Sequence, residues 1–192
     1  MMIKEAYSGP PQITTREPRL EDMEDLRAIL QKSLIDSESG NPITSEIEEV
    51  LSKIGQSLES NTAPIRYRVA EHPDGQLLGV MGMMYPDGDM VQYARSPNSC
   101  VELVNAFVDP EVRKSGAGRL LVDDLLRDAK VNGATEVVVN SGPRYRETGW
   151  PFWARVMSGK LDVSTEGYGE TALLKDKYGP GLDAMVWRAN IS

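Results

Sequence analysis

The sequence has very little of the residue types that build disulfides, bind metals or cross membranes. Its 192 residues include one cysteine, Cys100, and one histidine, His72. A single cysteine excludes an intrachain disulfide and is typical of a reducing compartment. No apolar run approaches the roughly 18 to 20 residues of a membrane-spanning helix, and the first residues do not resemble a signal peptide. We therefore expect a cytoplasmic protein that holds no metal and does not associate with membranes.

Basic residues are also in the minority. The 29 acidic side chains outnumber the 21 basic ones, for a net charge of −8. This balance argues against general nucleic-acid binding, which needs a basic face. It mildly favours a cationic partner, although an acidic surface also simply keeps a protein in solution. The length suits one domain, so we expect an irregular leader over residues 1–12 and one domain over residues 13–192.

Apolar periodicity divides this domain into helices and strands. Helical spacing predicts helices over residues 20–34, 45–58, about 116–132 and 151–157. A Ser45-x-x-Glu48 capping box should start the second of these. Apolar and β-forming runs predict strands over residues 13–17, 65–71, 76–85, 101–108, 136–140, 171–175 and 184–189. Residues 90–99 fit either a short strand or a loop, and the strand–helix–strand segment 101–140 should form a parallel pair.

The most informative stretch joins the strand at residues 101–108 to the helix that follows it. Residues 112–121 read Val-Arg-Lys-Ser-Gly-Ala-Gly-Arg-Leu-Leu. A helix start leaves amide N–H groups without partners, and glycine lets a ligand approach the backbone. Such amides, helped by the helix dipole, bind anions. Because Arg113, Lys114 and Arg119 form a cationic patch in an acidic chain, we predict that the ligand is a phosphate group.

Other glycine-rich phosphate motifs do not fit this stretch. A dinucleotide-binding Gly-x-Gly-x-x-Gly motif would need a third glycine where Leu121 stands, and no Gly-x4-Gly-Lys-Ser/Thr motif occurs. A lone Gly-x-Gly is also common in turns that bind nothing. A structural turn without a ligand is therefore the alternative interpretation.

The stretch resembles the acyl-CoA-binding motif of the GNAT family of N-acetyltransferases, Arg/Gln-x-x-Gly-x-Gly/Ala, read here from Arg113 to Gly118. The order of the predicted elements, from about Ile13 to Trp187, is also similar to that family's. The resemblance implies a single-domain α/β acyl-CoA N-acyltransferase fold. Its mixed, mostly antiparallel sheet would have about six to seven strands with one splayed parallel pair, and there would be about four helices. It further implies acetyl-CoA as the cosubstrate.

In that family the amides of the loop hold the coenzyme A pyrophosphate. The resemblance therefore implies a coenzyme-binding loop made of Arg113, Lys114, Ser115, Gly116, Ala117, Gly118 and Arg119. Main-chain groups of Phe107 and Val108, at the end of the preceding strand, would bind the thioester and the pantetheine arm, with both side chains in the core. Asn140, at the end of the next strand, resembles an asparagine that contacts the arm. A turn or C-capping role is its alternative.

Acetyl transfer to an amine calls for a base, because the thioester is already activated but the amine is not. An alkylamine has an unperturbed pKa of about 10.4 and is protonated at neutral pH. Glu102 is the candidate base. It lies on an otherwise apolar strand, where partial burial raises the pKa of a carboxyl group, and its spacing from Val108 is similar to that of the glutamate base in the family's histone-modifying branch. The alternative is a solvated or ion-paired glutamate at an exposed strand end.

The family's usual general acid has no counterpart in this sequence. Relatives carry a tyrosine in the short helix after the asparagine-bearing strand, whereas this chain has Trp153 in the corresponding segment. Tryptophan cannot donate a proton in this way. Tyr145, in an insertion before that segment, or another tyrosine takes the role, or no side-chain acid is used. Trp150, Phe152 and Trp153 are more typical of core packing or of an acceptor pocket wall.

We therefore predict an N-acetyltransferase that moves an acetyl group from acetyl-CoA to a primary amine by direct attack in a ternary complex. A non-catalytic acyl-CoA-binding or sensing module of the same fold is the second hypothesis. An adaptor without a ligand would leave the cationic patch unexplained. The expected partner is a small-molecule or peptide amine acceptor whose identity the sequence does not reveal. We expect no nucleic acid, and a homodimer is left open.

Overall fold

The computed structural model describes residues 12–60, 62–157 and 173–191. The leader expected over residues 1–12 lies outside the described residues except for Gln12, and so do the first two residues of the strand expected at 171–175. The boundary between leader and domain at residue 13 stays a prediction.

All strands of the described residues join one sheet in the order β1-β2-β3-β4-β5-β7-β6. β4 and β5 run parallel, and every other neighbouring pair is antiparallel. The predicted mixed, mostly antiparallel sheet with one parallel pair is thereby confirmed. The strands are β1 (Thr14–Arg16), β2 (Arg66–Glu71), β3 (Leu77–Met84), β4 (Cys100–Val108), β5 (Glu136–Ser141), β6 (Leu173–Leu174) and β7 (Ala184–Asn190).

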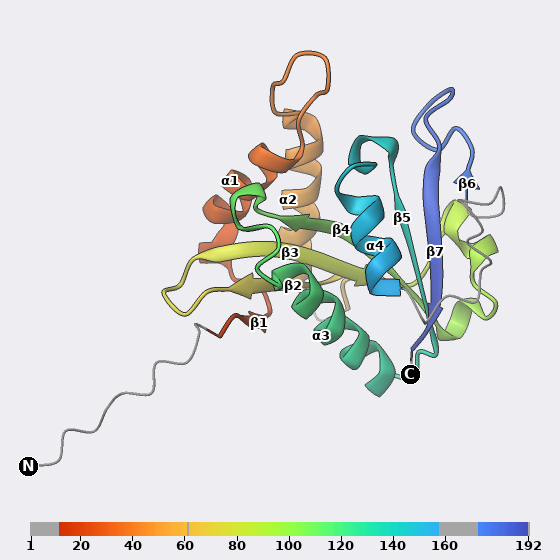
Figure 1. Cartoon of the computed structure of the whole chain (residues 1–192). Coiled ribbons are helices and arrows are strands. Elements are labelled where there is room, and N and C mark those ends of the chain that lie inside the picture. The colour runs from red at the N-terminus through yellow and green to blue at the C-terminus, as the bar shows by residue number, and fades with distance from the viewer. Residues whose placement is uncertain (1–11, 61, 158–172, 192) are drawn as a thin grey trace, which may run out of the picture.

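Helices cover both faces of this sheet (Figure 1). α1 (Met23–Ser33) and α2 (Thr44–Glu59) pack on one face, and α3 (Ala117–Val131) and α4 (Gly149–Met157) pack on the other. Each helix turns a stripe of apolar side chains toward the strands because residues three and four apart share a helix face. In α3 the buried members of the stripe are Ala117, Leu121, Val122, Leu125, Leu126 and Ala129.

The start of α2 differs from its prediction. The helix begins at Thr44 with Ile43 as the N-cap residue, and no side chain caps it. The expected Ser45-x-x-Glu48 capping box is therefore wrong. Glu48 instead binds the guanidinium group of Arg27 on α1. Because the helix begins one residue before Ser45, this serine lies in the first turn and cannot act as the N-cap residue.

The ambiguous segment 90–99 is neither a strand nor a plain loop. It contains most of the 3-10 helix η2 (Gly88–Tyr93) and all of a second one, η3 (Pro97–Ser99). The carboxylate of Glu136, at the start of β5, is buried and accepts a hydrogen bond from the backbone amide of Arg95 at 2.9 Å. This contact ties the segment between the two short helices to the central sheet.

Candidate functional site

The two parallel strands separate near the middle of the sheet. Pairing of β4 with β5 runs from Cys100 opposite Glu136 to Leu103 opposite Val139. β4 then continues to Val108 along β3, while β5 stays paired with β7 as far as Ser141, and Figure 1 shows β4 and β5 diverging. The splayed pair that the family resemblance implied is therefore present in the described residues.

A β-bulge shapes β4 where it leaves β5. Val80 pairs with Phe107 and Gly82 pairs with Val104, so two steps along β3 match three steps along β4. Asn105 has a backbone φ of +50°, which is uncommon for a residue other than glycine. Its side-chain Nδ2 donates a hydrogen bond to the hydroxyl of Tyr67 at 2.7 Å. That contact to a buried tyrosine of β2 holds the bulge in place.

The side chains at the end of β4 lie in the core, as expected. Phe107 is buried in the apolar cluster beneath α1 and α2, and Val108 packs against the cluster beneath α3 and α4. Side chains alternate between the two faces of a strand. Only main-chain groups of these two residues can therefore point along the sheet toward the space between the splayed strands.

The glycine-rich loop leads directly into α3. Gly116 is the N-cap residue, with a φ of +97° and no side-chain cap, and Lys114 also has a positive φ of +70°. The amide of Ala117 donates to Ser115 Oγ at 3.3 Å. The next helical amides, of Gly118 and Arg119, lie in the first turn, where an α-helix supplies no acceptor of its own. The predicted strand–loop–helix geometry is confirmed.

Gly118 brings the helix start against the end of β4. A Cβ atom built on it would lie 3.3 Å from the ring of Phe152 and 3.4 Å from Cγ2 of Val108. A larger side chain would fill the space between the loop, β4 and α4. The first turn of α3 therefore opens onto the splayed strand end.

The cations of the loop are not equivalent. Arg113 and Lys114 are exposed. Arg119 forms an ion pair with Asp123 one turn further along α3, at 2.9 Å. That neighbour offsets much of the positive charge that Arg119 adds to the patch.

Glu102 is buried, with only 4% of its surface exposed. Its neighbours Val101 and Leu103 belong to the cluster beneath α3 and α4, so its own side chain projects from the opposite face. Burial, and secondarily the nearby charge of Asp87, raise the pKa of this carboxyl group to about 7. The alternative of a solvated glutamate at an exposed strand end is wrong.

Asn140 lies within β5 and joins Glu102 to a residue that the sequence analysis had not selected. Its Nδ2 donates to Glu102 Oε1 at 3.1 Å, and its Oδ1 accepts from the hydroxyl of Tyr178 at 2.9 Å. Tyr178 lies in the loop between β6 and β7. Antiparallel pairing of Ser141 with Met185 sets the segment before β7 beside the end of β5. The sheet order, rather than any local motif, is the signal that could have identified this tyrosine.

Tyr145 lies in the 3-10 helix η5 (Pro143–Tyr145), directly after β5. Its ring is half-buried and packs against the cluster beneath α1 and α2. Burial raises the pKa of its hydroxyl, while the positive charges of Arg144 and Arg113 act in the opposite direction. Arg144 itself forms a two-pronged ion pair with Glu46 of α2, at 2.7 and 3.1 Å. Tyr145 thus lies between α2 and the cationic side of the glycine-rich loop.

The aromatic side chains of α4 serve the core. Trp150 and Trp153 are 5% and 4% exposed, and the rings of Phe152 and Trp153 meet edge to face at 4.9 Å. The indole N–H of Trp150 donates to the carbonyls of Ser141 and Gly142 at 3.0 and 3.1 Å. Trp153 is therefore a packing residue.

A sequence model of the acetyltransferase (GNAT) family matches residues 24–155, which is more than half of the chain. The chain belongs to the GNAT acetyltransferase family. None of the curated proteins is a significant match to it. The predicted family and enzyme class are confirmed, and acetyl-CoA is the acetyl donor that this family uses.

Solved GNAT-type structures share this fold. A GNAT-family protein from Desulfovibrio desulfuricans superposes with a TM-score of 0.70 at 16% identity, over 94% of this chain and 100% of that one. YncA of Salmonella typhimurium, solved with acetyl-CoA, has a TM-score of 0.64 at 14% identity, and the match covers 94% of this chain and 95% of that one. The PaiA N-acetyltransferase of Thermoplasma acidophilum, in complex with coenzyme A, has a TM-score of 0.60 at 18% identity, and the match covers 91% of this chain and 98% of that one. At these identities the likeness is one of fold.

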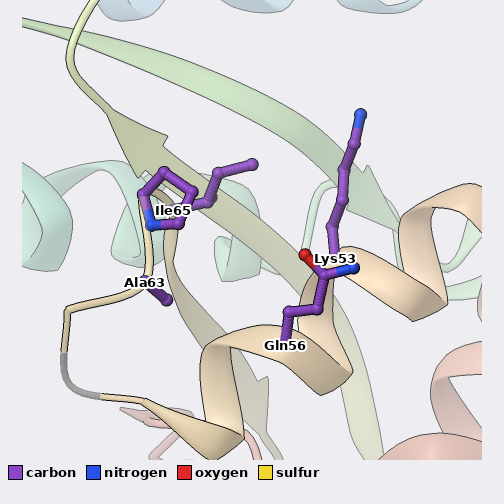
Figure 2. Close-up of a pocket in the computed structure, with 5 residues that line it drawn as sticks. Lys53, Gln56, Ala63 and Ile65 are labelled. Atoms are coloured by element: carbon purple, nitrogen blue, oxygen red, sulfur yellow. The ribbon is translucent and has the colours of Figure 1, made fainter.

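Other features of this GNAT protein lie apart from the site. Among the described residues no group of three or more histidine, cysteine, aspartate or glutamate side chains could hold a metal ion, and no helix is long and apolar enough to cross a membrane. A hollow of about 150 Å³ lies between the second half of α2 and the segment just before β2 (Figure 2). It contains none of the residues described above and is lined by Lys53, Gln56, Ala63, Pro64 and Ile65.

Proposed function

We propose that this GNAT acetyltransferase transfers the acetyl group of acetyl-CoA to a primary amine by direct attack in a ternary complex. The observation that carries the proposal is the position of Glu102. This buried carboxylate stands on β4 next to Leu103, the last residue that pairs with β5, and its pKa is about 7. A base with that pKa is half ionised at neutral pH, which is the range in which a general base works best.

The loop from Arg113 to Arg119 is the proposed coenzyme site. Amides of Gly116 and Gly118 would bind the pyrophosphate, because a glycine-led helix start presents N–H groups and a partial positive charge. The exposed side chains of Arg113 and Lys114 would add charge, and Arg119 would add less because Asp123 binds it. Ser115 and Ala117 would contribute through their backbone.

The arm of the coenzyme is proposed to lie along the splayed end of β4. Acetyl-CoA supplies an acyl group that is already activated as a thioester. Main-chain groups of Phe107 and Val108 would orient it there, since both side chains are engaged in the core. Asn140 keeps one N–H that its bond to Glu102 does not use, because an amide nitrogen carries two hydrogens. That hydrogen is the proposed contact to the arm.

Glu102 would remove the proton from the amine, and Tyr145 would supply one to the sulfur that leaves. The acceptor amine would therefore approach from the α1/α2 face, onto which Glu102 projects. Burial raises the pKa of Tyr145, so its hydroxyl keeps its proton at neutral pH and can donate it. Trp153 cannot do so. The net charge of −8 favours a cationic amine among small molecules and peptides.

Two measurements test the proposal. Release of free thiol from acetyl-CoA, screened across small amines, polyamines and peptides, should identify at least one acceptor that accelerates release well above hydrolysis. Calorimetry should show that coenzyme A binds the protein without an acceptor. Coenzyme binding without acceptor-dependent thiol release would support the non-catalytic binding module, and no binding at all would contradict the assignment of the loop.

A further inference from the structure

The loop between β6 and β7 is held by its own hydrogen bonds. Asp176 Oδ1 accepts from the amide of Gly181 at 2.6 Å, and the amide of Asp176 donates to Asp183 Oδ1 at 2.9 Å. The side chain of Lys177 forms an ion pair with Asp89 of η2 at 3.1 Å. These contacts fix the loop internally and tie it to a neighbouring element. The residue at its centre, Tyr178, is therefore presented in a defined position.

Tyr178 combines an exposed ring with a hydroxyl that points inward. Its relative exposure is 52%, yet its hydroxyl donates to Asn140 Oδ1 at 2.9 Å. The ring lies closely over Gly142, where an added Cβ atom would come within 2.8 Å of Cε2 of the ring. An aromatic ring that only covered surface would not need this fixed hydroxyl contact or a residue without a side chain beneath it.

Asn140 has one amide group with a donor end and an acceptor end. Glu102, when ionised, can only accept, so the nitrogen end must face it. The oxygen end then faces Tyr178, whose hydroxyl supplies the matching donor. The carboxylate selects this orientation of the amide, and the hydroxyl of Tyr178, which can donate or accept, satisfies the remaining oxygen in it.

We propose that Tyr178 is a positioning residue for Glu102: by donating to Asn140, it holds the side-chain amide in the orientation that binds the ionised carboxylate. The proposal rests on the assignment of Glu102 as the base. Tyr178 acts indirectly, through Asn140, and it affects the protonation of Glu102 rather than the coenzyme loop.

The charges around Glu102 determine the direction of the effect. Asp87, from the turn after β3, disfavours the ionised carboxylate, whereas Asn140 and Lys177 favour it. The uncharged thiol of Cys100 lies on the same strand. Without the hydroxyl of Tyr178 the amide of Asn140 is held by Glu102 alone and can rotate, so the hydrogen bond that Glu102 accepts is weakened. Ionisation of Glu102 then requires a higher pH.

The test is the pH profile of kcat/KM for Tyr178→Phe. The rise of kcat/KM on the acid side of the profile should move to higher pH by about 0.5 to 1 pH unit, which corresponds to the free energy of one hydrogen bond. The limiting rate at high pH should stay close to that of the parent, while the affinity for coenzyme A should fall slightly, because the same amide of Asn140 is the proposed contact to the coenzyme arm. Gly142→Ala should reproduce the shift, because a methyl group there displaces the ring and the φ of −70° at this position suits alanine. Tyr93→Phe, which removes a hydroxyl from η2, should leave the profile unchanged.

An unshifted acid side in a folded Tyr178→Phe protein would overturn the proposal, and so would an equal shift in Tyr93→Phe. The outcome is separable from that of the proposed function. If Glu102→Gln removes turnover while Tyr178→Phe leaves the profile in place, only the positioning role fails. If Glu102→Gln retains full turnover, the base assignment fails, and the positioning role fails with it.

Discussion

Gly118 offers a way to block the proposed coenzyme site without damage to the fold. A Cβ atom there would lie 3.3 Å from the ring of Phe152, and the ring would have to move by a few tenths of an ångström. Replacing a glycine within a helix adds roughly 0.5 to 1 kcal/mol of helix propensity. These opposing effects are of similar size, so a small side chain at Gly118 should leave the free energy of unfolding nearly unchanged.

Gly118→Asp adds a negative charge to the first turn of α3. A carboxylate near a helix N-terminus is favourable by roughly 0.3 to 1 kcal/mol, which offsets part of the cost of placing it beside Phe152 and Val108, so the free variant should melt close to the parent. A bound pyrophosphate would face that carboxylate. For two unit charges about 5 Å apart at an effective dielectric constant of about 20, the repulsion is about 3 kcal/mol, or roughly 200-fold in affinity. Affinity for coenzyme A should therefore collapse while stability holds.

Gly118→Asn is the matched control, because it adds nearly the same bulk without the charge. Calorimetry with coenzyme A and thermal melting of both variants separate the two effects. Asparagine should lose much less affinity than aspartate. Binding as tight as that of the parent in Gly118→Asp would refute the pyrophosphate reasoning. Equal losses in the two variants would show that bulk, and not charge, governs the site.

Two further substitutions test individual roles. Arg113→Ala should weaken coenzyme A binding more at low salt than at high salt, because salt screens an exposed charge. The control Arg127→Ala, further along α3, should have no effect at either salt concentration. A loss of affinity in Arg113→Ala that does not depend on salt would contradict an electrostatic role. Tyr145→Phe should lower turnover by roughly 10²-fold, which is the lower end of the range for loss of a general acid. Its affinity for coenzyme A, measured by calorimetry, should be unchanged. Full turnover in that variant would transfer the role to another group or to water.

Local patterns in the sequence were sufficient to predict the strand–loop–helix geometry of the proposed coenzyme loop. The apolar run of β4, the glycine with a positive φ at Gly116 and the periodic stripe of α3 are each properties of a few neighbouring residues. A capping box is equally local, but the one expected at Ser45 is absent because α2 begins at Thr44, which places Ser45 inside the first turn. The prediction of α2 from its apolar stripe was still correct, since the burial of apolar side chains against the sheet contributes more to the helix than a single cap.

The proposed catalytic face depends on contacts between distant strands, and the sequence alone did not specify these contacts. Burial of Glu102 comes from its place in the middle of a seven-stranded sheet, which no neighbour of Glu102 in the sequence specifies. The contact of Tyr178 with Asn140 joins residues 38 positions apart and follows from β7 pairing with β5. Side chains of this kind become recognisable only once the strand order is known.

The ionisation of Glu102 also makes the free energy of unfolding depend on pH, and its raised pKa determines the direction of that dependence. Its folded-state pKa of about 7 is above the ordinary value of 4.5. The unionised form therefore favours the folded state, and the stability that it contributes is full below about pH 4.5 and is lost as the pH rises through about 7. Glu102→Gln, which stays neutral, should be at least as stable as the parent at pH 8. A loss of activity in this variant would then not be a loss of folding.

The most direct test of the proposed mechanism is the pH–rate profile of acetyl transfer by Glu102→Gln beside that of the parent. The parent's kcat/KM should rise with pH through about 7, the pKa of Glu102. In the variant that rise should vanish, turnover at neutral pH should fall by roughly 10² to 10⁴-fold, and higher pH should restore part of it as more amine becomes neutral. Affinity for acetyl-CoA should be unchanged. Full turnover in a folded Glu102→Gln protein, with the parent's profile intact, would contradict the assignment of Glu102 as the base.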